Sequence, residues 1–288
     1  KVSDIAGWVP LLLATVTHYL LGMPIAHLED RAVIAVAGPE ARGFLQGLIT
    51  NDIERLAPGT GIYAALLTPR GKILFDFFLV EGDGAILIDC PAPARAALLK
   101  RLTLYKLRAK VVLEPRDQLA VLAEWGGGHA KYAIEYPDPR LDALGRRAIV
   151  AKGEMRNDVL PAAAYRTHRL SLGVPEGADF GSDKIFALDA GLDELNAVDF
   201  KKGCYVGQEL TARMKHRGTA RKRLLPVKTD SEMPGTSVSA AGKEIGEVVS
   251  DCFALIRLDR LEEARRTGAT VTIGSNPIEL VEPAWLFA

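Results

Sequence analysis

One cysteine of the chain lies in a setting that could support thiol chemistry. Cys204 falls within Lys201–Glu209, a stretch whose double lysine and two glycines surround it. Glycine lets the backbone turn sharply and approach a ligand closely. The thiolate is the reactive form of a cysteine, and nearby cations or a helix N-terminus favour it. The sequence therefore predicts a single activated thiol at the start of a helix over Tyr205–Met214.

The alternative for any cysteine is a packing role, because cysteines outside disulfides are among the most buried residues and usually behave as small hydrophobes. A cysteine that only packs gains nothing from adjacent glycines, since glycine costs order in a regular element. We therefore favour the reactive interpretation for Cys204. Cys90, directly before Pro91, and Cys252, in an apolar strand pattern, are predicted to be packing residues.

Composition places the chain among ordinary soluble globular proteins. Its 288 residues are long enough for two or three domains, and 48% are hydrophobic and 25% charged. The formal net charge is zero, so no global field steers the whole molecule toward nucleic acid or a membrane. Charge is uneven locally: between Lys201 and Arg223 there are eight Lys or Arg residues and a single acid, Glu209.

The spacing of possible metal ligands predicts no metal site. Three widely spaced cysteines without a CxxC pair argue against a disulfide framework and favour a reducing compartment. They also argue against a permanently held iron–sulfur cluster, which normally takes four protein thiolates. The five histidines are scattered singly, and no zinc pattern is present.

The first 25 residues are interpreted as an N-terminal extension of unclear role. The apolar run Trp8–Leu21 is too short, and too interrupted by polar residues and proline, to span a bilayer. No A-x-A cleavage pattern follows it. We expect a soluble protein without a membrane partner, whose folded pattern begins near Ala26.

The rest of the chain predicts an α+β fold. Strands and helices alternate irregularly, and the turn Thr68–Gly71 is typical of a hairpin, which argues against a doubly wound parallel sheet. No G-x-G-x-x-G and no Walker loop is present. Expected strands are Ala32–Val36, Ile62–Leu67, Lys72–Val80, Ala85–Asp89, Val111–Glu114 and Leu119–Ala123, and expected helices are Pro39–Leu48, Pro91–Leu107 and Pro161–Leu172.

The pattern changes after Gly218. Short apolar runs alternate with turn clusters such as Pro234–Gly235, which is typical of a small all-β barrel. We place the boundary near residue 222, so that residues 26–221 form the α+β region and residues 222–288 the barrel.

The stretch Lys202–Glu209 resembles the hallmark of the folate-binding YgfZ family, whose eukaryotic relatives act in mitochondrial iron–sulfur protein maturation. The resemblance runs from about Ala26 to the C-terminus. Further matching segments are Phe44–Asp52, Pro69–Lys72, Arg213–Gly218, Ile245–Val248 and Ala254–Leu258.

This family in turn is similar to the aminomethyltransferase (T-protein) of the glycine cleavage system. The resemblance implies two ferredoxin-like modules plus a C-terminal β-barrel, arranged as in the T-protein, with tetrahydrofolate bound in a central hole. A loop aspartate of the transferase handles the folate amine chemistry, and Asp52 falls at the corresponding place; Asp76 matches another acidic position. The transferase has no cysteine where this chain has Cys204, which favours the YgfZ branch. One departure is the stretch around Asp189, which lacks the family's proline.

A folate site needs a few placed polar groups for the pterin and cations for the anionic tail. Asn51 and Asp52 offer donors and acceptors, although both residue types also cap turns routinely. Glu209 could equally favour the helix dipole without touching a ligand. Other candidates around the motif are Lys202, Gly203 and Gln208, and candidates for the tail are Arg70, Arg213, Lys215 and Arg217.

The leading hypothesis is a tetrahydrofolate-dependent accessory factor for assembly or repair of iron–sulfur clusters in client enzymes, including those that modify tRNA, with Cys204 as its reactive thiol. Its partners would be folate and iron–sulfur client or assembly proteins, in the bacterial cytoplasm or the mitochondrial matrix. The first alternative is a folate-dependent aminomethyl or one-carbon transferase assisted by Asp52. The second is an RNA-binding module using Lys201–Arg223, which is disfavoured because Tyr205 is the only Phe, Tyr or Trp among those cations.

Overall fold

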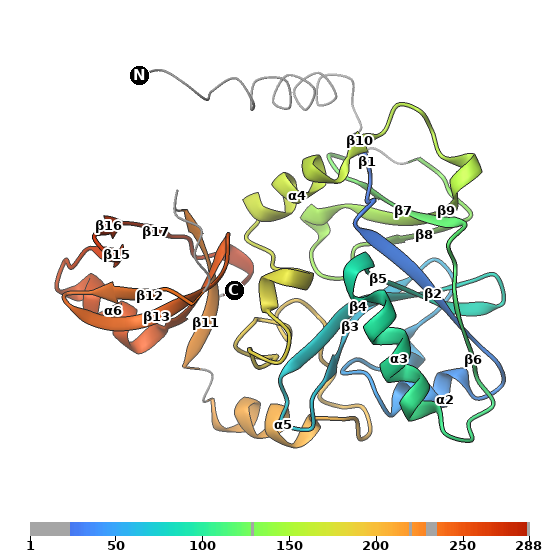
Figure 1. The fold of residues 1–288 in the computed structure, drawn as a ribbon, viewed down its shortest axis with the longest axis horizontal. Helices are drawn as coiled ribbons and strands as arrows, with labels where there is room; N and C mark the ends of the chain where they lie inside the picture. The colour runs from blue at the N-terminus through green and yellow to red at the C-terminus, as the bar shows by residue number, and fades with distance from the viewer. Residues whose placement is uncertain (1–23, 128–129, 219–220, 229–234, 287–288) are drawn as a thin grey trace. The chain divides into compact units, whose positions relative to one another are not determined.

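The computed structural model describes residues 24–127, 130–218, 221–228 and 235–286 (Figure 1). The N-terminal extension therefore lies almost entirely outside the described residues. By their contacts, the residues fall into two units: residues 1–44, 54–62 and 77–169, and residues 45–53, 63–76 and 170–288. In the described part, no helix has the length and apolar character needed to cross a membrane.

The first unit contains a five-stranded sheet of order β10-β1-β7-β9-β8. The central strand β7 pairs antiparallel with both β1 and β9, and β1 pairs parallel with β10. Small and branched apolar side chains such as Ile25, Leu122 and Val150 form the core on this sheet. The strands are β1 (Ile25–His27), β7 (Leu119–Glu124), β8 (Ile134–Pro137), β9 (Arg146–Ala151) and β10 (Leu160–Pro161).

A second five-stranded sheet has the order β3-β4-β5-β2-β6, and β3 and β4 contribute residues to both units. Strand β2 lies between β5 and β6 and is almost wholly buried, as its apolar sequence RAVIAVA requires. Helix α3 buries Leu98 and Leu102. The elements are β2 (Arg31–Ala37), α2 (Ala41–Gln46), β3 (Gly61–Leu67), β4 (Ile73–Gly82), β5 (Ala85–Pro91), α3 (Arg95–Lys106) and β6 (Val112–Pro115).

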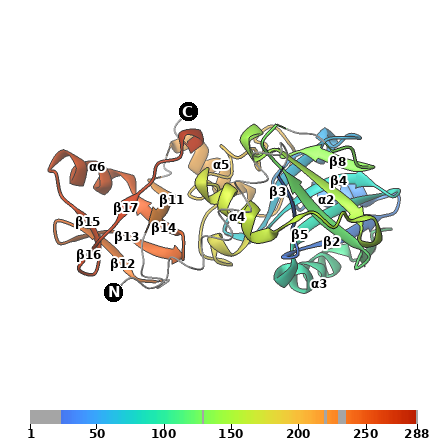
Figure 2. The same cartoon turned by 90° about the horizontal axis from the view of Figure 1, so that it is seen from above.

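The C-terminal part of the second unit is a seven-stranded sheet of order β16-β15-β12-β13-β14-β11-β17 (Figure 2). Its interior is filled by residues such as Leu225, Val238 and Ile256. The elements are β11 (Lys222–Lys228), β12 (Ser237–Ala240), β13 (Lys243–Ser250), β14 (Phe253–Arg257), α6 (Leu258–Arg266), β15 (Val271–Ile273), β16 (Asn276–Pro277) and β17 (Glu279–Leu280).

Three helical segments differ from the sequence-based prediction. The helix expected over Pro39–Leu48 is shorter and spans Ala41–Gln46. The helix expected over Pro91–Leu107 begins as a 3-10 turn at Ala92–Ala94 and becomes α-helical only at Arg95. The barrel was expected to be all β, but it carries helix α6, which buries Leu261 and Ala264 against it. Helix α4 (Ala162–Ser171) agrees with the prediction to within one residue at each end. The predicted domain boundary near residue 222 stays a prediction.

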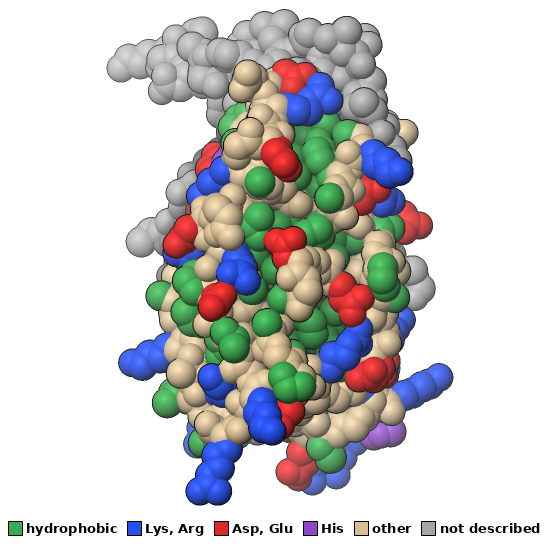
Figure 3. Space-filling view, turned by 90° about the vertical axis from the view of Figure 1, so that its right-hand side faces the viewer, with side chains coloured by type: hydrophobic (Ala, Val, Ile, Leu, Met, Phe, Trp, Pro, Cys, Tyr) green, Lys and Arg blue, Asp and Glu red, His purple; other side chains and the backbone are tan. Residues whose placement is uncertain are grey.

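Figure 3 shows one face of the molecule on which cationic, anionic and apolar side chains are interspersed. This mixture agrees with the zero net charge of the sequence. The 3-10 helices are η1 (Ile53–Arg55), η2 (Ala92–Ala94), η3 (Asp142–Leu144), η4 (Lys152–Glu154), η5 (Gly177–Phe180) and η6 (Ala284–Leu286).

Candidate functional site

Cys204 lies in an irregular segment of the second unit, and its side chain is exposed. Helix α5 (Gln208–Arg217) begins four residues after it, so the prediction of a helix from Tyr205 was wrong at its start. The cause is Gly207, which has a positive φ of 85°. A Cβ on this residue would lie 2.5 Å from the Thr68 carbonyl oxygen. Gly207 therefore lets the chain turn into α5 against the hairpin.

The other glycine of the motif has no such explanation within the chain. Gly203 has no positive φ, and a Cβ placed on it would meet nothing within 4 Å. Neither the local backbone nor packing among the described residues requires a glycine here. A position without a side chain beside the exposed Cys204 leaves the backbone open to close approach by a ligand or partner.

Lys202 is buried, and its amine forms hydrogen bonds with the backbone of another loop. Nζ donates hydrogen bonds to the carbonyl oxygens of Gln46 (2.8 Å), Ile49 (2.6 Å) and Asn51 (2.9 Å). An ammonium group has three donors, so this arrangement uses all of them. Burial lowers the pKa of Lys202 to about 8, although Asp52 and Asp199 act in the opposite direction. The sequence predicts a ligand-binding role for Lys202, whereas its contacts make it an anchor for the loop that carries Asp52.

Further hydrogen bonds join the same two segments. Asp199 accepts from the amides of Lys201 and Lys202, at 2.7 and 3.1 Å, and its own amide donates to the Thr50 carbonyl. Thr50 Oγ1 donates to the Ala197 carbonyl at 2.6 Å. The segment that leads to Cys204 is therefore fixed to the loop at residues 49–52.

Asn51 and Asp52 differ in what they can offer a ligand. Asn51 is buried, and its amide group donates to the carbonyl oxygens of Tyr63 and Asn196, both at 2.8 Å. Its Oδ1 accepts from the Asp52 amide, so the Asn51 side chain organises the loop. Asp52 is half-buried, and its Oδ1 accepts from Gln46 Nε2 at 2.8 Å. Of the two, Asp52 is the better placed to meet a ligand.

The remaining predicted residues are brought together only in part. Arg70 is exposed at the tip of the hairpin, whose Gly71 lies against Gly207 and Leu210 at the start of α5. Gln208 and the exposed Glu209 form the first turn of that helix. Arg213 and Arg217 are exposed further along it, and Arg217 lies nine positions after Gln208, about 13.5 Å along the helix axis. Their role in binding a folate tail stays a prediction.

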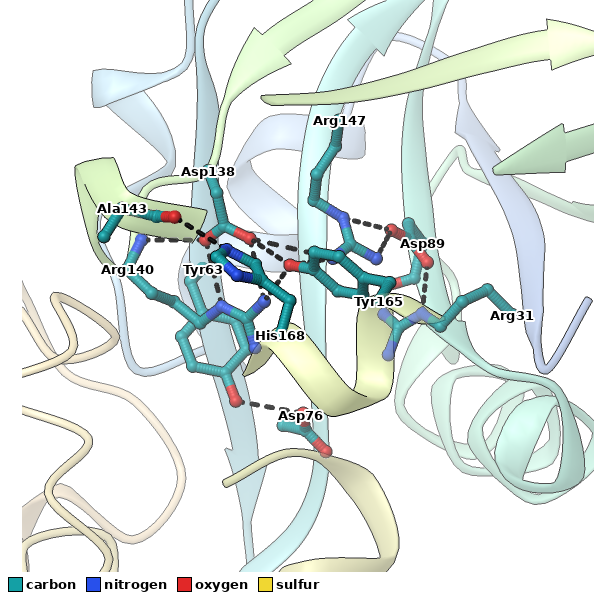
Figure 4. Close-up of polar contacts among 10 residues, drawn as sticks. All are labelled: Arg31, Tyr63, Asp76, Asp89, Asp138, Arg140, Ala143, Arg147, Tyr165 and His168. Atoms are coloured by element: carbon teal, nitrogen blue, oxygen red, sulfur yellow. Dashed lines mark hydrogen bonds and ion pairs between the residues drawn. The ribbon is translucent and has the colours of Figure 1, made fainter. Parts of the chain in front are cut away.

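A buried carboxylate of the second unit was noted in the sequence only as a family match. Asp76 is 2% exposed; its Oδ2 accepts from the Tyr63 hydroxyl at 2.9 Å and its Oδ1 from the Gly177 amide at 3.1 Å (Figure 4). The contact with Tyr63 follows from the predicted hairpin that joins β3 and β4, whereas no local signal pairs Asp76 with Gly177, 101 residues further along the chain. Among the described residues, no group of three or more His, Cys, Asp or Glu side chains could hold a metal ion.

The first unit contains a buried ion network that sequence reasoning missed. Asp89 accepts from Arg31 Nε at 2.6 Å and from Arg147 Nη2 at 2.9 Å (Figure 4). Asp138 accepts from Arg140 through both of its oxygens. Burial raises the pKa of Asp138, but Arg140 and Arg147 outweigh it, and the pKa lies below its usual value. The five side chains are almost fully buried, which indicates a structural role.

Three comparisons with known proteins bear on this arrangement. Residues 221–288 match the model of the CAF17 C-terminal β-barrel domain. The iron–sulfur cluster assembly factor IBA57 of Mus musculus, described as mitochondrial, is 34% identical over 247 residues, which cover 74% of this chain and 68% of the mouse protein. The Homo sapiens protein of the same name is 34% identical over 265 residues, 76% of this chain and 72% of that protein.

The chain belongs to the IBA57 family of iron–sulfur cluster assembly factors. The coverage of other members is lower: the Neurospora crassa IBA57 homologue is 35% identical over 70% of this chain, and the chain spans 53% of that protein. The prediction of a family concerned with iron–sulfur proteins is confirmed, and the link of this IBA57 relative to YgfZ stays a prediction.

The fold of this IBA57-family chain is also that of a solved structure. The crystal structure of the glycine cleavage system aminomethyltransferase T from Bartonella henselae matches it with a TM-score of 0.66 and 18% identity, over 85% of this chain and 82% of that protein. At this identity the likeness shows the fold alone. The predicted fold class, an α+β protein with a C-terminal β-barrel arranged as in the T-protein, is confirmed.

Proposed function

We propose that this chain is an assembly or repair factor for iron–sulfur clusters, with Cys204 as its reactive thiol and a reduced folate as its ligand. The observation that carries the proposal is the setting of Cys204. The thiol is exposed, Gly203 beside it leaves room for approach, and Lys202 fixes the segment to the loop of Asp52. The names of the IBA57 relatives support a role in iron–sulfur cluster assembly.

The thiol is tested by complementation. We expect Cys204→Ser to abolish rescue of iron–sulfur enzyme activities in cells that lack their own family member, because serine cannot supply a thiolate. The exposed position predicts an unchanged melting temperature. Cys252→Ser is the matched control, since it also removes one thiol and should retain rescue. Full rescue by Cys204→Ser would remove the thiol from the mechanism.

Tetrahydrofolate fits the polar groups of the site. Asp52 is a half-buried carboxylate that can accept hydrogen bonds from the amino group and ring N–H of a pterin, and Arg70 at the neighbouring hairpin offers a cation. When bound, tetrahydrofolate would supply N5 of its pterin ring and the adjacent amine N10 as acceptors of one-carbon units. The chain's own residues bind and orient it, and Lys202 and Asn51 hold the loop in place.

Titration with tetrahydrofolate tests the ligand. Asp52→Ala should raise the dissociation constant about 10- to 100-fold, because a hydrogen bond to a charged group contributes roughly 1.5–3 kcal/mol. The readout is isothermal calorimetry or fluorescence of the folate. Asp251→Ala, which removes an exposed turn carboxylate of the barrel, should leave the constant unchanged. Equal affinity of wild type and Asp52→Ala would exclude this aspartate from the site.

The finer assignments follow from the same proposal. The partners would be iron–sulfur client or assembly proteins, including enzymes that modify tRNA. The compartment would be the mitochondrial matrix, as the names of the relatives indicate for those proteins, or the cytoplasm of a bacterium. Folate-dependent turnover of an aminomethyl donor would contradict this proposal and indicate a transferase instead.

A further inference from the structure

Helix α3 and the segment that follows it form a cationic surface of the first unit. Residues 90–113 contain no Asp or Glu. Arg95 pairs with Asp117. The other five cations form no ion pair with any residue that the structure describes; they are Lys100, Arg101, Lys106, Arg108 and Lys110.

Large apolar side chains protrude from the same surface. Leu104 is 62% exposed, Leu107 86% and Val112 50%. Lys100 and Leu104 have the i, i+4 spacing of one helix face, opposite the buried Leu98 and Leu102, and Leu107 directly follows the helix. Val112 begins β6, the edge strand of the sheet, which lies beside α3 (Figure 1). We call Lys100, Leu104, Leu107, Arg108 and Val112 the α3 face.

Leu107 is unusual in its backbone as well as in its exposure. It ends helix α3 with a φ of 45° and a ψ of −110°. Residues with a side chain rarely adopt a positive φ, and glycine is the usual residue at such a position. With 86% of its surface exposed, Leu107 gains almost no burial in return. A leucine here is explained if its side chain is buried in something outside the chain.

We propose that the α3 face docks on an anionic lipid surface, with Leu104, Leu107 and Val112 entering the interface and the cations meeting headgroup phosphates. Basic helices with exposed apolar residues bind membrane surfaces in this way. A bilayer accepts protruding leucines without a matching pocket. A protein partner is less suited, because lysine is depleted at protein interfaces and this segment has three lysines. Zero net charge predicted no membrane contact, but the charge of this face is local.

Vesicle flotation with the full chain tests whether the cations of the α3 face bind an anionic lipid surface. We expect binding to vesicles of phosphatidylcholine with phosphatidylglycerol, none to phosphatidylcholine alone, and release by high salt. Lys100→Gln with Arg108→Gln should lower the partition coefficient about 25-fold, since each cation near an anionic surface is worth about 1 kcal/mol. Lys131→Gln with Lys152→Gln, which removes two exposed cations of the same unit, should change it less than about 2-fold.

The leucines separate lipid from other polyanions. Leu107→Gly should lower vesicle binding about 10-fold or more, because the buried side chain is lost, while the melting temperature stays equal or rises because glycine suits a positive φ. Leu104→Gln, on the exposed helix surface, should lower binding similarly. Binding to both vesicle types alike, or to neither, would overturn the proposal. Unchanged vesicle binding by both leucine variants would overturn it as well. If the wild type and both leucine variants were retained equally on polyglutamate, the partner would be an acidic protein instead of a lipid surface.

Discussion

Asp89→Asn is expected to lower the free energy of unfolding by about 3–5 kcal/mol, because it leaves buried guanidinium groups without their carboxylate. Asp89 is fully buried and accepts from Arg31 Nε at 2.6 Å and from Arg147 Nε and Nη2 at 3.1 and 2.9 Å. Asparagine keeps the size of the side chain but removes its charge. Arg147 then keeps the Asp138 carboxylate, at 3.7 Å, in place of the close contact with Asp89. Denaturation in urea measures the loss.

The controls separate the buried pair from ion pairs in general. Asp117→Asn removes the partner of Arg95, but the Asp117 side chain is 73% exposed, and the expected loss is under about 1 kcal/mol. Arg31→Met with Asp89→Leu and Arg147→Met removes the whole set and leaves Asp138 paired with Arg140. This triple variant should be more stable than Asp89→Asn, since replacing a buried ion set by apolar residues is often neutral. A loss below about 1 kcal/mol for Asp89→Asn would contradict the assigned role.

The guanidinium groups of this network also surround an aromatic ring. The Cζ atoms of Arg31, Arg140 and Arg147 lie 5.4, 4.7 and 4.1 Å from the ring centroid of Phe78. Cations over a ring face are attracted by its quadrupole, more strongly where water is excluded. This contact offsets part of the excess of three cations over two carboxylates.

The sequence predicted much of the fold because its signals there are local. The hairpin at Thr68–Gly71 and the nearly continuous apolar run of β2 depend only on neighbouring residues. The missed features depend on contacts between distant segments. Arg31, Asp89 and Arg147 are separated by 58 residues at each step, and no local pattern pairs them. Asp138 and Arg140 are only two residues apart, yet the sequence Asp138-Pro139-Arg140 indicates only a loop.

The candidate site shows the same division. The motif identified Cys204, and its exposure agrees with a reactive role. Gly207 could be recognised as special, but its reason, close packing against the Thr68 carbonyl, appears only in three dimensions. Lys202 was interpreted as a cation for the thiol because it is two residues away in sequence. Its acceptors lie about 150 residues earlier in the chain, where no sequence pattern could place them.

Lys202→Met is expected to lower the free energy of unfolding by about 2–4 kcal/mol. The change removes three hydrogen bonds, and buried acceptors without a donor cost about 1–3 kcal/mol each. The loss is smaller than their sum because methionine keeps most of the apolar stem and no charge remains buried; burial already lowers the pKa of Lys202 to about 8. Urea denaturation gives the total, and hydrogen exchange should show faster opening at residues 46–52.

Lys201→Met is the matched control, because it removes the same charge one residue away from an exposed side chain. It should cost less than about 0.5 kcal/mol. If both lysines served only as cations near Cys204, the two variants would change its alkylation rate alike and leave stability unchanged. If Lys202 anchors the loop that carries Asp52, only Lys202→Met destabilises the chain and weakens tetrahydrofolate binding. Lys202→Arg should then restore neither stability nor binding fully. A planar guanidinium cannot direct three donors to the carbonyls of Gln46, Ile49 and Asn51 in the geometry of an ammonium group.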